Sequence, residues 1–107
     1  GELEGEVYEV AYKQDIEPGK AYIISEVSGE RAEYEIEIES LDYSGDEENK
    51  GILFKVTDER LLDLTGGIVQ GMSGSPIIQN GKMIGAVKHV FVSDASMGYG
   101  IFIEKML

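Results

Sequence analysis

The amino-acid sequence predicts an all-β fold, an antiparallel β-barrel or sandwich with one short helical turn. The first indication is a strict alternation over residues 32–39, where apolar side chains and glutamates occupy opposite faces of a strand. The second is an Asn80-Gly81 pair between two apolar runs, which is typical of a two-residue hairpin turn. The third is the regular spacing of turn residues along the chain, which leaves room only for short strands.

Three strands are predicted in the N-terminal half. Residues 6–12 alternate loosely, and Pro18-Gly19 then marks a turn. Residues 20–27 are rich in β-branched and aromatic side chains, and Ser28-Gly29 leads into a strand over residues 30–41. Four glutamates on one exposed face of this last strand would repel aggregation partners, which favours an edge position.

The C-terminal half begins with an acidic loop over residues 42–50 and a strand over residues 51–56. Residues 57–64 predict one or two helical turns, because a capping residue is followed by acids in the first turn. A loop is expected over residues 93–98. The remaining strands are expected over residues 76–79, 82–92 and 99–104.

Length and charge limit the classes of function. The chain has 107 residues, and we treat residues 1–107 as a single domain. The net charge is −12, and residues 1–48 hold sixteen of the twenty-one acids, which argues against nucleic acid and anionic membranes as partners. No cysteine is present, and the acids lack EF-hand spacing, so we interpret them as a solvated sheet face and expect no metal or cofactor. No apolar stretch approaches the roughly 20 residues of a membrane-spanning helix, so we expect the chain to be soluble.

A serine between glycines carries the clearest chemical signal, in the run Gly71-Met72-Ser73-Gly74 with Pro76 shortly after. Ser73 can act as a nucleophile. Glycine adopts positive φ without strain, so the N–H groups of Gly71 and Ser73 can turn toward one point and bind an oxyanion. The run therefore suits acyl transfer, although the same four residues also occur in ordinary turns.

The residues after this run place Ser73 beside a hairpin. If Asn80-Gly81 forms the whole loop, Gly85 lies opposite Pro76, and Lys88 lies opposite Ser73. Ser73 is then expected at the mouth of a tight hairpin, on a turn that leads into a strand.

Several motifs together resemble a known family. Ser73-Gly74-Ser75-Pro76-Ile77-Ile78, Gly85-Ala86-Val87 and Gly98-Tyr99-Gly100-Ile101 are similar to the C-terminal barrel of a trypsin-like serine protease. The run from Gly66 to Val92 more closely resembles the stage IV sporulation protein B (SpoIVB) peptidases of spore-forming bacteria. The resemblance is specific over residues 57–107. Before residue 57, only the general pattern of strands and turns is similar.

This resemblance implies one antiparallel β-barrel and a partial peptidase domain. Residues 1–50 would form an acidic β-strand region, and residues 51–107 the nucleophile-bearing region. The resemblance assigns Ser73 as nucleophile, Asp58 as triad acid, and the N–H groups of Gly71 and Ser73 as oxyanion hole. An aspartate at the start of a helical turn is also a common N-cap, so Asp58 has a purely structural interpretation as well. The implied substrate-binding residues are Gln70, Lys88, His89, Val90, Gly98 and Gly100.

The general base is the missing part of this assignment. A serine nucleophile at neutral pH needs a base, and His89 is the only histidine in the sequence. The resembled peptidases take their base from an upstream Gly-His segment, which nothing here matches. We interpret His89 first as a structural or substrate-lining residue, and only second as a catalytic base.

The resulting hypothesis is a serine endopeptidase fragment that has little activity alone. The resemblance implies autoproteolysis, a regulatory subunit of a membrane protease complex as substrate, and a location between the two membranes around a developing spore. The expected partners are a peptide substrate, the upstream part of the same peptidase domain and, through exposed strand edges, further copies of the chain. The alternative is a non-catalytic module that binds an extended peptide along Lys88 to Val90.

Overall fold

The computed structural model describes residues 9–10, 15–26, 28–41, 51–66, 72, 74–90 and 96–103. In chain order, the elements of these residues are β1 (Glu9–Val10), β2 (Gly19–Ser25), β3 (Ala32–Leu41), β4 (Ile52–Val56), α1 (Glu59–Thr65), β5 (Pro76–Gln79), β6 (Lys82–Val90) and β7 (Met97–Phe102). None of the helices in this part of the chain is long and apolar enough to cross a membrane.

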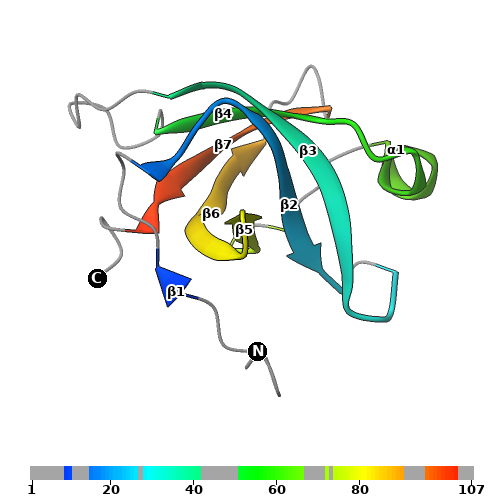
Figure 1. Ribbon diagram of the computed structural model, residues 1–107. Helices are drawn as coiled ribbons and strands as arrows, with labels where there is room; N and C mark the ends of the chain where they lie inside the picture. Colours follow the sequence, from blue (N-terminus) through cyan, green and yellow to red (C-terminus); the bar gives the residue numbers. More distant parts are fainter. Residues whose placement is uncertain are drawn as a thin grey trace.

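Six of these strands form a closed antiparallel barrel (Figure 1). The order around the barrel is β5-β2-β3-β4-β7-β6, and the pairing of β6 with β5 completes the circle. β5 returns to lie beside β2 after the β2-β3-β4 meander, which is a Greek-key connection. β1 adds to the start of β6 as a short parallel pairing. The predicted all-β antiparallel barrel with one short helix is therefore confirmed.

β3 has the alternation that the sequence predicts, but it is not an edge strand. Tyr34, Ile36 and Ile38 are buried, whereas Glu37 and Glu39 are exposed. The strand pairs with β2 on one side and β4 on the other, because these three consecutive strands form an antiparallel meander with β3 in the middle. The edge prediction for this strand is therefore wrong.

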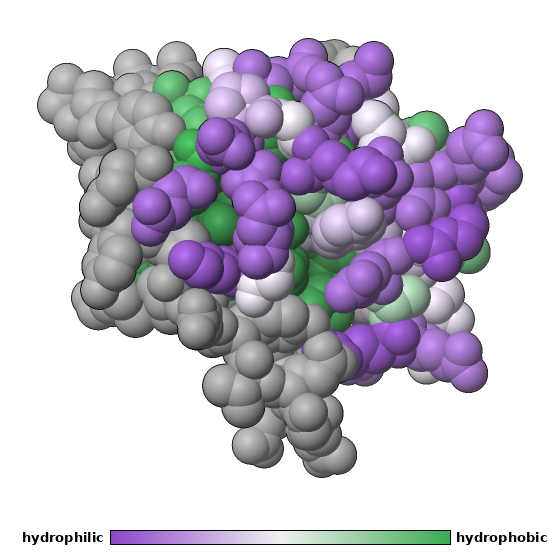
Figure 2. All heavy atoms as spheres, viewed as in Figure 1, coloured by the Kyte–Doolittle hydropathy of each residue, from purple (hydrophilic) through white to green (hydrophobic). Residues whose placement is uncertain are grey.

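The acids of β3 belong to the outer wall of the barrel. In the register of the sheet, Glu37 lies between Lys20 of β2 and Lys55 of β4. Figure 2 shows hydrophilic side chains over much of the face that β2 and β3 present to the viewer. This agrees with the interpretation of the acids as a solvated sheet face.

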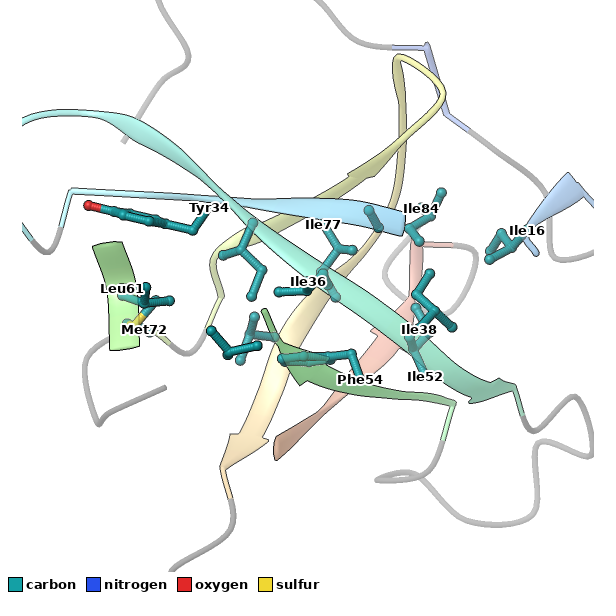
Figure 3. Packing of buried hydrophobic residues seen from close by; sticks show 14 of the residues in the cluster. Ile16, Tyr34, Ile36, Ile38, Ile52, Phe54, Leu61, Met72, Ile77 and Ile84 are labelled. Atoms are coloured by element: carbon teal, nitrogen blue, oxygen red, sulfur yellow. The ribbon is translucent and has the colours of Figure 1, made fainter. Parts of the chain in front are cut away.

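The barrel is filled mainly by isoleucine and other branched side chains, with two phenylalanines (Figure 3). β3 and β4 contribute alternate residues, as the two-residue period of a strand requires. Leu61 of α1 and Met72 close one end of this core and are both buried. The largest fully buried side chains are Phe54, Phe102, Ile23, Ile36, Ile38, Ile52, Leu61, Met72, Ile77, Ile84 and Val56.

The β5–β6 hairpin has the predicted turn but a shifted register. Asn80 and Gly81 both have positive φ, 53° and 77°, as a type I′ turn requires. Beyond Ile78 the pairing shifts by one residue, so Gly85 lies opposite Ile77 and not opposite Pro76. The extra residue in β6 is a β-bulge, which the hairpin rule alone does not anticipate. The predicted opposition of Gly85 and Pro76 is therefore wrong.

Tertiary pairing also moves the start of the last strand. The loop predicted over residues 93–98 ends earlier, because Met97 pairs with Lys55 and Gly98 pairs with Phe54 in β4. Residues 91–95 lie outside the described part of the chain. Local sequence favours a loop at a glycine, but two neighbouring strands here extend β7 through Gly98.

Gln79 holds the segment from Glu17 to Lys20, which leads into β2, against β5. Its side chain is buried, accepts a hydrogen bond from the Glu17 N–H at 3.1 Å, and donates to the carbonyl oxygens of Glu17 at 2.8 Å and Lys20 at 3.1 Å. One buried amide thus satisfies three backbone groups of the segment from Glu17 to Lys20.

Gln79→Met is expected to lower the free energy of unfolding by about 1–2 kcal/mol, because the volume is kept while these hydrogen bonds are lost. Urea unfolding followed by circular dichroism measures the change. Asn80→Gly is the matched control, because glycine tolerates the positive φ at that position. Equal stability of Gln79→Met and the unmodified protein would contradict the role given to the amide.

Candidate functional site

The candidate site lies at one end of the barrel. Neighbouring strands are antiparallel, so β2, β4 and β6 all end at the same rim, where β3, β5 and β7 begin. Asp58 follows β4 by two residues, and Ser73 precedes β5 by three. Lys88 to Val90 end β6, and Gly98 is the second residue of β7. The topology therefore gathers the predicted site segments at a single rim.

Ser73, Gly71 and Gln70 lie outside the described residues, but the residues that flank Ser73 are described. Met72 is buried in the core cluster that also contains Leu61, and Figure 3 places both at the same end of the core. Gly74 is exposed and has a φ of 90°. The Ser75 N–H donates to the Met72 carbonyl at 3.0 Å, which closes a tight turn.

This turn is tied to β6. The Gly74 N–H donates to the Val87 carbonyl at 2.7 Å, and the Val87 N–H donates to the Ser75 carbonyl at 2.9 Å. Two residues of the turn therefore face one residue of β6, which is the arrangement of a β-bulge. The glycine that follows Ser73 is held by backbone contacts beside the last residues of β6.

Asp58 is the N-cap of α1. Its Oδ1 accepts a hydrogen bond from the Arg60 N–H at 2.9 Å, as capping requires. Its Oδ2 accepts from the Glu35 N–H at 3.0 Å, which ties the helix to β3. In return, the Glu35 carbonyl accepts from the N–H groups of Thr57 and Asp58, both at 3.1 Å. The structural interpretation of Asp58 as a cap is confirmed, and its catalytic role stays a prediction.

Arg60 covers the same carboxylate from the solvent side. Its Nε donates to Oδ1 of Asp58 at 3.0 Å and its Nη2 to Oδ2 at 2.8 Å, a bidentate ion pair. Nη2 also donates to the Glu33 carbonyl at 2.6 Å, and the guanidinium carbon lies 5.2 Å from the ring centroid of Tyr34. The Asp58 side chain is 11% exposed, whereas that of Arg60 is 67% exposed.

These contacts control the charge of Asp58. The hydrogen bonds from the Arg60 side chain hold the pKa of the Asp58 carboxyl well below its ordinary value of 3.8. Burial acts in the opposite direction, and the N–H groups of Glu35 and Arg60 add to the lowering of the pKa. In return, Asp58 raises the pKa of the Arg60 guanidinium. Asp58 is therefore an anion at neutral pH.

The predicted substrate-binding glycines occupy inward positions of β7. Gly98 and Gly100 are both buried, and a Cβ on Gly100 would lie 2.6 Å from Ile77 Cδ1 and 3.0 Å from the Ala86 carbonyl oxygen. Gly100 is therefore required for close packing within the barrel. Whether either glycine also borders a substrate pocket stays a prediction.

The end of β6 pairs with β7. His89 lies opposite Tyr99 and Val90 opposite Gly98, and a register shift falls between Val87 and His89. Lys88 is exposed. The structure describes the backbone of His89 and Val90 only, so the roles proposed for these side chains stay predictions. Among the described residues, no group of His, Cys, Asp or Glu side chains is arranged to hold a metal ion.

Arg60 is the member of this rim that sequence reasoning missed. An arginine two residues after a capping aspartate is a usable signal, because both lie near the first turn of the helix. This signal alone does not predict the ion pair, because Glu33 and Tyr34 of β3 hold the guanidinium in position.

Comparison with known proteins identifies the class and then the family. The family model described as SpoIVB peptidase S55 matches residues 2–107. The barrel and this match together define a peptidase-related domain. The chain belongs to the SpoIVB peptidase family, as the sequence motifs predict. Neither the curated proteins nor the solved structures give a match.

Proposed function

We propose that this chain is the nucleophile-bearing part of a serine endopeptidase. The observation that supports the proposal most is the placement of the Asp58 segment and the residues flanking Ser73 at one rim of the barrel. Membership of the SpoIVB peptidase family supports it independently. The expected substrate is a peptide in extended form.

In the proposed mechanism, Ser73 Oγ attacks the scissile carbonyl carbon while a histidine accepts its proton. The N–H groups of Gly71 and Ser73 stabilise the oxyanion of the tetrahedral intermediate. The C–N bond then breaks, the histidine returns the proton to the leaving amine, and water hydrolyses the acyl-enzyme. Asp58 orients the histidine, which we propose comes from outside this sequence.

The proposed setting follows the family resemblance. Autoproteolysis and cleavage of a regulatory subunit of a membrane protease complex are the proposed reactions, in the space between the two membranes around a developing spore. Pairing with further copies through strand edges finds less support, since each barrel strand in the described part of the chain has neighbours on both sides.

A fluorophosphonate probe tests the nucleophile in the longer parent protein. We expect covalent labelling that Ser73→Ala abolishes and that the matched control Ser75→Ala preserves, because Ser75 contributes backbone bonds to the turn. Labelling that survives Ser73→Ala would remove Ser73 from the mechanism. For the isolated chain we expect little turnover, and steady peptide hydrolysis that depends on Ser73 would instead make His89 the base.

A peptide-binding module is the second candidate function. The observation behind it is that β6 pairs with β7 up to Val90, so the backbone of residues 88–90 has the extended form that strand addition uses. An extended peptide could add along Lys88 to Val90 as a further strand. Peptide binding that survives Ser73→Ala, together with no labelling of Ser73, favours this module over the enzyme.

A further inference from the structure

The Asp58 carboxylate has a full set of hydrogen-bond donors. A carboxylate offers about four lone-pair sites. At Asp58 these face the N–H groups of Glu35 and Arg60 and the Nε and Nη2 atoms of the Arg60 side chain, at 2.8–3.0 Å. A histidine that is to be oriented by Asp58 needs one of these sites. One of the four donors must therefore withdraw first.

The four donors differ in how easily they can withdraw. The Glu35 N–H belongs to β3 in the barrel wall, and the Arg60 N–H belongs to the first turn of α1. Moving either group would disturb an element of the fold. The Arg60 side chain is 67% exposed and belongs to no strand pairing or helix backbone, so it can turn into water without disturbing an element of the fold. The guanidinium is therefore the donor that can leave.

Two further contacts keep the guanidinium at this position in the described structure. Nη2 donates to the Glu33 carbonyl, and the guanidinium lies over the Tyr34 ring. Both contacts come from β3, which also supplies the Glu35 N–H to Asp58. Arg60, in the first turn of α1, is thus held against β3 by two contacts besides its ion pair with Asp58.

We propose that Arg60 is an autoinhibitory residue that occupies Asp58 until a histidine displaces it. The proposal rests on the proposed function, because it assumes that Asp58 orients a catalytic histidine. In the resting arrangement Arg60 and the histidine compete for the same oxygens. Activity is then reduced by the fraction of molecules in which Arg60 remains bound.

The first measurement is the titration of the Asp58 carboxyl carbon by NMR in this chain. Arg60→Ala is expected to move the pKa of Asp58 up toward 3.8, because the largest cause of its lowering is removed. Lys55→Ala is the matched control, an exposed cation on β4 that is expected to leave the titration unchanged. An unchanged pKa in Arg60→Ala would overturn the proposal.

The second measurement is the rate of fluorophosphonate labelling of Ser73 in the parent protein. If Arg60 competes with the histidine, Arg60→Ala is expected to raise this rate by about threefold or more, since the competent fraction rises. Arg60→Lys keeps the charge but loses the bidentate geometry, so it is expected to give a smaller increase and also guards against a folding defect in the alanine variant. A rate that stays equal or falls in both variants overturns the inhibitory role.

The outcomes separate this proposal from the proposed function. If the unmodified parent protein is labelled at Ser73 and Asp58→Asn abolishes labelling, the proposed function holds whatever Arg60 does. If labelling never occurs at Ser73, or is insensitive to Asp58→Asn, the proposed function and the role of Arg60 fail together.

Discussion

Gly85→Ala is expected to lower the free energy of unfolding by about 3 kcal/mol or more, at the upper end of what overpacking costs. A Cβ at this position would lie 2.0 Å from the Ile101 carbonyl oxygen and 3.0 Å from its carbonyl carbon. Both atoms are backbone of β7, which pairs with β4 as well as β6 and cannot move away from β6 alone. Urea unfolding followed by circular dichroism measures the loss.

Gly66→Ala is the control that separates steric overlap from backbone strain. Gly66 ends α1 with a φ of 80°, and a Cβ there would meet no atom within 4 Å. We expect a loss of about 1 kcal/mol for the left-handed conformation alone. If Gly85→Ala costs no more than Gly66→Ala, the close approach of β6 and β7 at Gly85 is wrong.

Asp58→Ala is expected to lower the free energy of unfolding by about 2–4 kcal/mol, because it removes an N-cap and leaves a partly buried N–H without its acceptor. The N–H group concerned is that of Glu35 in β3. Thermal and urea unfolding of the purified variant measure the loss. Asp63→Ala is the matched control, since Asp63 is an exposed acid on the same helix and should change stability by less than about 0.5 kcal/mol.

The same aspartate gives stability a dependence on pH. The pKa of Asp58 in the folded chain lies below its ordinary value of 3.8, so the folded state binds its proton later than the unfolded chain does. Its contribution is complete above about pH 5, where the carboxyl is ionised in both states, and is lost as pH falls through the folded pKa. We expect Asp58→Asn to remove this part of the acid sensitivity, and equal acid sensitivity in both proteins would contradict it.

This double role affects how catalytic tests are interpreted. A loss of activity in Asp58→Ala would combine a missing histidine partner with a destabilised rim. Asp58→Asn keeps an acceptor oxygen for the Glu35 N–H while removing the negative charge. The asparagine variant is therefore the better test of the proposed triad acid.

The sequence predicts local patterns well here because each has a direct physical cause. The glutamates of β3 define one face of a strand through the two-residue period, and Asn80-Gly81 supplies the two positive φ angles of its turn. The helix over Glu59–Thr65 follows from its cap and its terminal glycine.

Features that depend on distant partners were not predictable in the same way. β3 is interior to the sheet because both β2 and β4 pair with it, which its own alternation does not specify, and the bulge after Ile78 shifts the partner of Gly85. The Arg60 side chain reaches Asp58 from a position set by β3. The assignments of Ser73, Gly71 and Gln70 rest on motif and family resemblance and stay predictions.

The pairing of β2 with β5 has a consequence for the order of folding. It is confined to Tyr22 with Ile78 and Ile23 with Ile77, residues that are far apart in the chain. In contrast, every residue of β2 pairs with β3, and only a short connection separates the two strands. Because a long loop must be closed before such contacts form, the pairing of β2 with β5 is expected to form last during folding. A partly folded chain would then contain an open, curved sheet with β2 and β5 as its two edge strands.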